Sequence, residues 1–122
     1  MEFKISREFL SEIVQLISEN KAQELLLLLE DIHFADIAEI MEELDDYGAG
    51  YIFNTLDSEK TAEILLELDE EVREKILKNL SPKEIAEELD ELSTDDAADI
   101  IAELPQDKKE QVISELEDVE HA

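Results

Sequence analysis

Cysteine is absent from the 122-residue chain, so the fold has neither a disulfide nor a thiolate metal site. Only two glycines and two prolines are present, and tryptophan is missing. With so few residues that interrupt helices, the abundant Leu, Ile, Ala, Glu and Lys favour helical structure in one domain. The longest apolar run, Leu25 to Leu29, is far shorter than the roughly 20 residues that span a bilayer.

Basic residues are also scarce, since ten Lys and Arg stand against 36 Asp and Glu, a formal net charge of −26. We expect no nucleic-acid partner, because nucleic-acid binding needs a basic surface that displaces counterions. An anionic membrane surface would repel the chain as well. The charge favours divalent cations and basic protein surfaces as partners, although solubility alone would also explain it.

Apolar residues recur at intervals of twelve along most of the chain. The series is Ile32, Leu44, Leu56, Leu68, Leu80, Leu92, Leu104 and Leu116. A polar residue or proline follows most members, as in Ser81-Pro82-Lys83-Glu84, which reads as a capping box with proline at the first helical position. Between members the apolar spacing is helical. The series therefore predicts short helices of about 12 residues, each ending at an apolar residue.

The pattern Ala-Glu-x-x-x-x-Leu recurs every 24 residues, from Ala38, Ala62 and Ala86, so the repeating unit is a pair of helices. Helices of about three turns are marginal alone and must pack on their neighbours. Stacked helix pairs form an α-solenoid. The sequence therefore predicts an all-α solenoid of short helices.

We divide this single domain into N-terminal helices over residues 1–31 and helical repeats over residues 32–116. The polar residues 117–122 are expected to form a disordered tail. Both glycines fall between Tyr47 and Tyr51, where a short or frayed helix is expected because glycine costs about 1 kcal/mol in a helix.

Residue patterns typical of catalysis are absent, and we predict that the chain is not an enzyme. The sequence contains no Gly-rich phosphate loop, no HExxH motif and no recognisable pairing of nucleophile and base. His33 lies at a predicted helix entry, where capping or packing is favoured over metal binding.

Three acids, Asp95, Asp96 and Asp99, follow a predicted N-cap at Ser93 and carry the strongest functional signal. The helix dipole favours acids in a first turn, but Asp99 lies one turn further along. Carboxylates four residues apart share a helix face and repel, by roughly 0.7 kcal/mol in water at about 6 Å. Mg²⁺ would reverse that repulsion, since it accepts one or two carboxylates and keeps several waters. The spacing leaves two interpretations open, half of a metal site and a solvated acidic face.

Three stretches of the chain resemble the N-terminal cytoplasmic domain of the MgtE family of magnesium transporters. They are Phe34 to Ile40, Lys60 to Leu65 and, most specifically, Leu-Ser-Thr-Asp-Asp-Ala-Ala-Asp from Leu92 to Asp99. The resemblance implies a right-handed superhelix that precedes CBS domains and a membrane channel conducting Mg²⁺ as a homodimer. We therefore expect this chain to be part of a longer protein, on the cytoplasmic side of the cell membrane.

The resemblance also implies a function for the acidic residues. Mg²⁺ held between this domain and the CBS domains would close the pore, with Asp95 and Asp99 as ligands. Glu63 matches a further acidic position of the family, and Asp96 is an additional candidate. The alternative is an acidic helical-repeat scaffold that binds a partner protein without sensing a metal.

Overall fold

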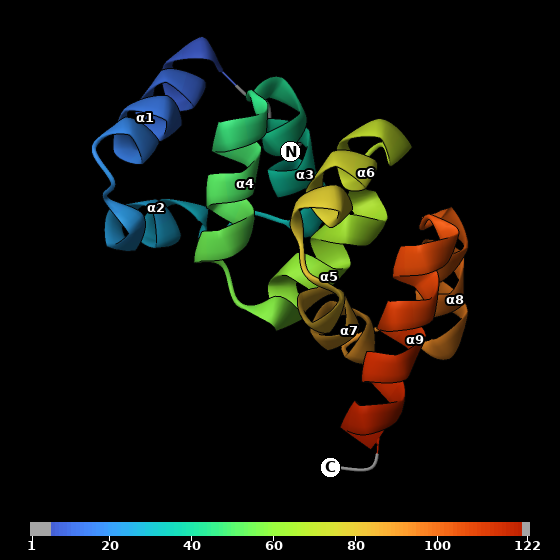
Figure 1. The fold of residues 1–122 in the computed structure, drawn as a ribbon. Helices are drawn as coiled ribbons and strands as arrows, with labels where there is room; N and C mark the ends of the chain where they lie inside the picture. Colours follow the sequence, from blue (N-terminus) through green and yellow to red (C-terminus); the bar gives the residue numbers. More distant parts are fainter. Residues whose placement is uncertain (1–5, 121–122) are drawn as a thin grey trace.

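A computed structural model describes residues 6–120 of the chain, with side chains through residue 117. Within this range all regular structure is helical, so the predicted all-α class is confirmed (Figure 1). The helices are α1 (Arg7–Ser18), α2 (Ala22–Leu29), α3 (Phe34–Glu43), α4 (Asp46–Thr55), α5 (Ser58–Glu67), α6 (Glu70–Asn79), α7 (Pro82–Asp90), α8 (Thr94–Glu103) and α9 (Gln106–Glu120). None of these described helices is both long and apolar enough to cross a membrane.

The twelve-residue interval has a local cause in the structure. From α3 to α6 each helix has ten residues. One N-cap residue before the helix and one C-cap residue after it complete the twelve-residue repeat. Five members of the apolar series are C-caps with extended backbone, namely Leu44, Leu56, Leu68, Leu80 and Leu104. Of the other members, Ile32 and Leu92 follow just after a helix, and Leu116 lies within α9.

Short polar side chains begin most of these helices. The N-cap side chains that accept a backbone N–H are those of Ser6, His33, Asp45, Asp57, Ser81 and Ser93. The predicted capping box is present, because Ser81 and Glu84 each accept the other's backbone N–H at 3.1 and 3.0 Å. His33 Nδ1 accepts the N–H of Ala35 at 3.1 Å, so this histidine caps α3 as expected. Such caps stabilise helices that are too short to persist alone.

Helices pack mainly on the helix two places further along the chain. Thus α3 packs on α5, α5 on α7, α7 on α9, and α4 on α6. Leu65 of α5, Ile85 and Leu89 of α7 and Val112 of α9 are buried along this stack. Packing of every second helix is what stacked helix pairs predict, whereas the handedness of the superhelix stays a prediction. The stack places α1 and α2 at one end of the molecule and α8 and α9 at the other (Figure 1).

The expectation of a short or frayed helix around the glycines is wrong, since α4 has ten residues, as many as its neighbours. Gly48 is buried beside the N-cap, and its N–H donates to Asp45 Oδ1 at 2.8 Å. A Cβ at Gly48 would lie 3.1 Å from Leu44 Cβ and 3.1 Å from Asp45 Oδ1. Glycine therefore allows the close approach that the capped turn needs, and this packing outweighs its low helix propensity.

The C-terminal boundary also differs from the expected one. Helix α9 passes Glu117, where the tail was placed, and continues to Glu120. Leu116 packs against the core, and α9 packs along α7. The last helix is therefore held to the rest of the fold by tertiary contacts. Residues 121 and 122 of the expected tail lie outside the described residues.

Candidate functional site

The acids that the sequence singles out lie at the start of α8. Ser93 caps this helix, and its Oγ accepts the N–H of Asp96 at 3.3 Å. Asp95 and Asp99 are exposed, whereas Asp96 is half-buried. Because Asp95 and Asp99 are four residues apart in a helix, their carboxylates share one face, as predicted.

Among the described residues, no basic side chain forms an ion pair with an acid of this face. The ion pairs there join lysines or Arg73 to acids outside this group. Solvent and the positive end of the helix dipole near Asp95 offset the mutual repulsion of Asp95 and Asp99. An exposed carboxylate pair of this kind is available to a cation from outside the domain.

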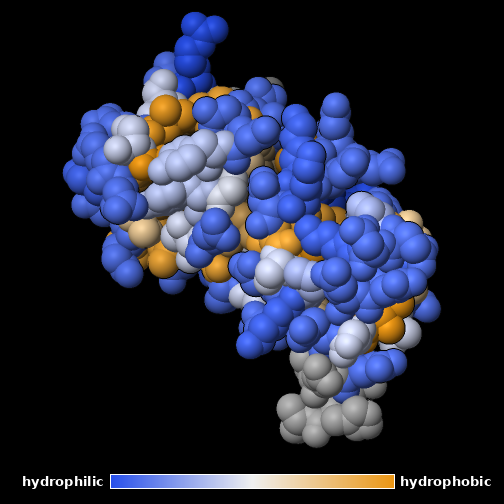
Figure 2. Space-filling model, in the orientation of Figure 1, coloured by the Kyte–Doolittle hydropathy of each residue, from blue (hydrophilic) through white to orange (hydrophobic). Residues whose placement is uncertain are grey.

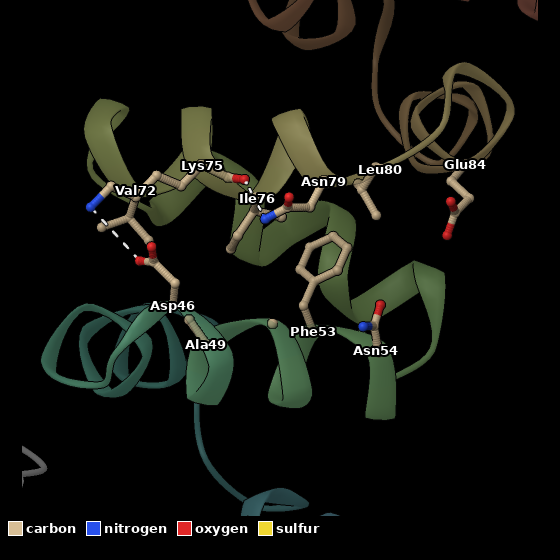
Figure 3. Close-up of a pocket in the computed structure, with 11 residues that line it drawn as sticks. Asp46, Ala49, Phe53, Asn54, Val72, Lys75, Ile76, Asn79, Leu80 and Glu84 are labelled. Carbon is tan, nitrogen blue, oxygen red and sulfur yellow. Dashed lines mark hydrogen bonds and ion pairs between the residues drawn. The ribbon is translucent and has the colours of Figure 1, made fainter.

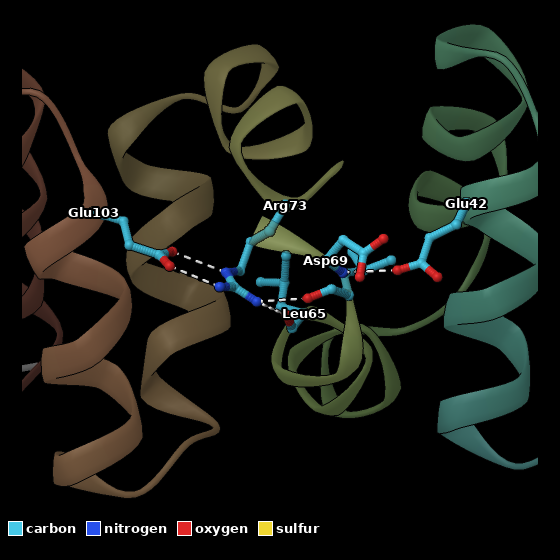
Figure 4. Close-up of polar contacts among 6 residues, drawn as sticks. Glu42, Leu65, Asp69, Arg73 and Glu103 are labelled. Carbon is cyan, nitrogen blue, oxygen red and sulfur yellow. Dashed lines mark hydrogen bonds and ion pairs between the residues drawn. The ribbon is translucent and has the colours of Figure 1, made fainter. Parts of the chain in front are cut away.

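Glu103 continues the four-residue spacing beyond Asp99, but it is neutralised. The guanidinium of Arg73, on α6, donates to Glu103 through Nη2 at 2.6 Å and Nε at 2.8 Å (Figure 4). Its Nη1 donates to the carbonyl oxygens of Leu68 at 2.8 Å and Leu65 at 3.1 Å. Hydrogen bonding to Glu103 raises the pKa of the Arg73 guanidinium, so Arg73 keeps its positive charge. Arg73 thus fastens the end of α8 to the end of α5.

Glu63 lies exposed on α5, away from the α8 group in the sequence and on a different helix. In the part of the chain that the structure describes, no three His, Asp or Glu side chains come together as a group that could hold a metal ion. Glu63 therefore does not complete a site with Asp95, Asp96 and Asp99. The chain offers a carboxylate pair, which fits Mg²⁺ as half a site because this ion keeps several of its waters.

A second acidic feature, which the sequence analysis missed, is buried between α5 and α7. Glu88 is 8% exposed, and the Thr61 hydroxyl lies 2.7 Å from each of its carboxylate oxygens. Burial raises the pKa of Glu88 to about 7 against the lowering effect of Thr61, and the negative charges of Glu87, Glu91 and Asp57 add to the rise. This carboxyl belongs to the helix stack and is not available to solvent ions.

Signals for the missed residues existed in the sequence. Glu88 stands three residues after Ile85 and next to Leu89, at an apolar position of the helical period. Glu103 stands four residues after Asp99, so the acidic spacing continues for one more turn. The basic partner Arg73, thirty residues before Glu103, has no such local signal.

Comparisons with known proteins bear on this arrangement. The family model of the MgtE intracellular N domain matches residues 32–122. The fold is similar to a crystal structure of the soluble part of a magnesium transporter, with a TM-score of 0.77 and 20% sequence identity. That match covers 88% of this chain and 43% of the other, so this chain spans less than half of that protein's length. A comparison with curated proteins found no match. At this identity the structural likeness shows the fold alone.

Proposed function

This chain belongs to the family of MgtE intracellular N domains, and from that premise we propose that it is a cytoplasmic Mg²⁺-sensing domain of a magnesium transporter. The observation that carries the proposal is the exposed pair Asp95 and Asp99 on one face of α8, with no basic partner among the described residues. Mg²⁺ would bind between this face and CBS domains of the same longer chain, which assembles as a homodimer.

The mechanism is electrostatic. A domain with a net charge of −26 is repelled by any other acidic domain, so the two stay apart when Mg²⁺ is scarce. Mg²⁺ supplies two positive charges and binds carboxylate oxygens from both sides of the gap. The closed arrangement of the domains then gains stability because the ion binds it better than the open one, and closure biases the pore shut.

Each candidate residue has a place in this scheme. Asp95 and Asp99 hold the ion from the α8 side, and Asp96, which is half-buried beside them, adds negative potential. Glu63 acts from α5 on a separate ion across the same gap, since it does not group with the α8 acids. Arg73 keeps Glu103 out of the ligand set by holding both of its carboxylate oxygens.

An amide NMR titration with MgCl₂ tests the proposal, with NaCl of equal ionic strength as the reference. We expect Mg²⁺-specific shifts to concentrate between Ser93 and Glu103. They should disappear when Asp95→Asn and Asp99→Asn are combined. The combination of Glu8→Gln and Glu12→Gln is the matched control, because these exposed acids occupy the same two positions of α1.

Two outcomes would count against Mg²⁺ sensing by α8. Shifts that spread over all acids and equal those in NaCl would mean a diffuse counterion atmosphere. An unchanged Mg²⁺ response in the double Asn variant would place the ion elsewhere. Either result would favour the alternative function, an acidic scaffold that binds a partner without sensing a metal.

A further inference from the structure

The outward face of α4 carries far less charge than the rest of the molecule. Tyr47, Gly50, Tyr51 and Asn54 form one stripe along this helix, at spacings of three and four residues, and none of them is charged. In Figure 2 the surface over α4 is pale with orange patches beside it, whereas most of the surrounding surface is blue. In a chain with a net charge of −26, such a face is the exception.

Three hollows with partly apolar linings follow this stripe. A hollow of about 330 Å³ lies between α1 and the start of α4, with Val14 and Leu44 in its lining. A second, of about 580 Å³, lies between α2 and α4 beside Leu26. A third, of about 130 Å³, lies between α4 and α6, where Phe53 points from α4 toward Ile76 (Figure 3).

These hollows adjoin one another. Tyr47 lines the first and the second, and Gly50 and Asn54 line the second and the third. The stripe and its three hollows, hereafter the α4 groove, run along the whole of a ten-residue helix, a length of about 15 Å. A groove of this length accommodates about three turns of a second helix.

Gly50 has no structural explanation within the described chain. Apart from its chain neighbours and the backbone of its own helix, nothing lies within 4 Å of the position that its Cβ would occupy, in contrast to the crowded surroundings of Gly48. Alanine would therefore fit at position 50 and would form a better helix. What glycine does provide, on the open face of a groove, is room for another backbone to come close. Tyr47, 70% exposed beside it, offers the amphipathic ring that protein interfaces favour.

The charges that line the groove select the kind of occupant. Glu43, Asp45, Asp46 and Glu84 are among its lining residues, and Lys75 is the basic one, 3.7 Å from Asp46. A second copy of this chain would bring another 26 negative charges and is disfavoured. An occupant with an apolar stripe between basic residues matches the apolar parts of the hollows and the acidic residues beside them.

We propose that the α4 groove docks a basic amphipathic helix of a partner protein. The apolar side chains of that helix fill the hollows beside Tyr47, and its backbone passes closest at Gly50. Its Lys or Arg side chains lie against the acids of the groove. This surface lies on a different helix from the acidic face of α8, so the two activities can be lost separately.

A synthetic Leu/Lys peptide of about four helical turns is the probe, with its leucines at helical spacing. A peptide of the same composition in scrambled order is the control for charge alone. Fluorescence anisotropy of the labelled peptides measures affinity, and amide NMR locates the contact. We expect the periodic peptide to bind about tenfold more tightly than the scrambled one and to shift the amides of α4.

Gly50→Ala is the decisive variant, because a structural role and a docking role predict different outcomes. We expect it to raise the thermal midpoint by about 3 °C while weakening the periodic peptide about tenfold. Tyr47→Ala should also weaken the peptide. Leu27→Ala is its matched control, since Leu27 is likewise 70% exposed but lines none of the three hollows, and it should leave affinity unchanged.

Several results would overturn the proposal. Equal affinity of the two peptides would mean that charge alone attracts them. Unchanged peptide affinity in Gly50→Ala would remove the reason for glycine in the groove. Shifts of the α4 amides that grow with protein concentration, without peptide, would identify a second copy as the occupant instead.

Discussion

Glu88 on α7 and Asp99 on α8 are acids on neighbouring short helices, yet the fold gives them opposite surroundings. Helix α7 lies between α5 and α9, so the Glu88 carboxyl is buried against Thr61. Helix α8 has Ile100 as its single buried residue within the helix, and Asp99 is exposed. Acids in this chain are therefore not equivalent. Those between stacked helices act on stability, and those on α8 are free to act on a ligand.

Glu88 gives the largest effect expected from this contrast. Its pKa of about 7 in the folded chain exceeds the ordinary value of 4.5, so the folded state binds this proton more strongly than the unfolded state. The corresponding stability is fully present below about pH 4.5 and is lost as the pH rises through about 7, by about 3 kcal/mol. Urea denaturation at about pH 5 and pH 8 measures this loss as a fall in the free energy of unfolding.

Glu88→Gln should remove most of that pH dependence, because an amide keeps the shape and the hydrogen bond to Thr61 without ionising. Asp90→Asn is the matched control, since it removes one negative charge from an exposed position of the same helix and Asp90 does not contribute to the raised pKa of Glu88. In this variant the free energy of unfolding should fall with pH as steeply as in the wild-type chain. If the slopes of the Glu88→Gln and wild-type chains are equal, the buried carboxyl does not titrate in this range and the contrast with α8 fails.

Arg73→Ala is expected to have the next largest effect, about 2 kcal/mol of lost stability. The change leaves Glu103 and two carbonyl oxygens without their donor, at a site where the Arg73 and Glu103 side chains are only 15% and 27% exposed. Hydrogen exchange should also rise in α8, because its end is no longer held to α5. Urea denaturation and amide exchange measure the two effects.

Lys75→Ala provides the comparison for that variant. Lys75 also forms an ion pair from α6, with Asp46, but both partners are largely exposed. Its loss should therefore cost less than about 0.5 kcal/mol. Equal losses in the two variants would show that Arg73 does not fasten α8 in the way its contacts indicate.

The smallest effect is expected for Asp99→Asn, which should stabilise the chain in the absence of divalent ions. Removing a like charge four residues from Asp95 relieves roughly 0.2 to 0.5 kcal/mol of repulsion. Thermal denaturation at low ionic strength should detect a slightly raised midpoint, and added Mg²⁺ should cancel this advantage. A lowered midpoint would instead reveal a structural partner for Asp99 and would end the distinction between α7 and α8.

Much of the helical pattern was predictable, because helix ends depend on nearby residues. Ser81 and Glu84 form the predicted capping box, and the C-cap leucines fall where the twelve-residue series places them. The exposed pair on α8 follows from four-residue spacing in the same way. The expectation for α4 failed because propensity was weighed without the local contacts of Gly48 with Leu44 and the N-cap Asp45.

The all-α class, the ends of most helices and the acidic face of α8 follow from the sequence alone, since each depends on residues within about one repeat. The tertiary structure sets which helices are interior. It placed Thr61 against Glu88 across 27 residues and Arg73 against Glu103 across 30. It also opened a groove along the uncharged stripe of α4. Such pairings depend on how helices stack in space, and local propensity carries no information about that.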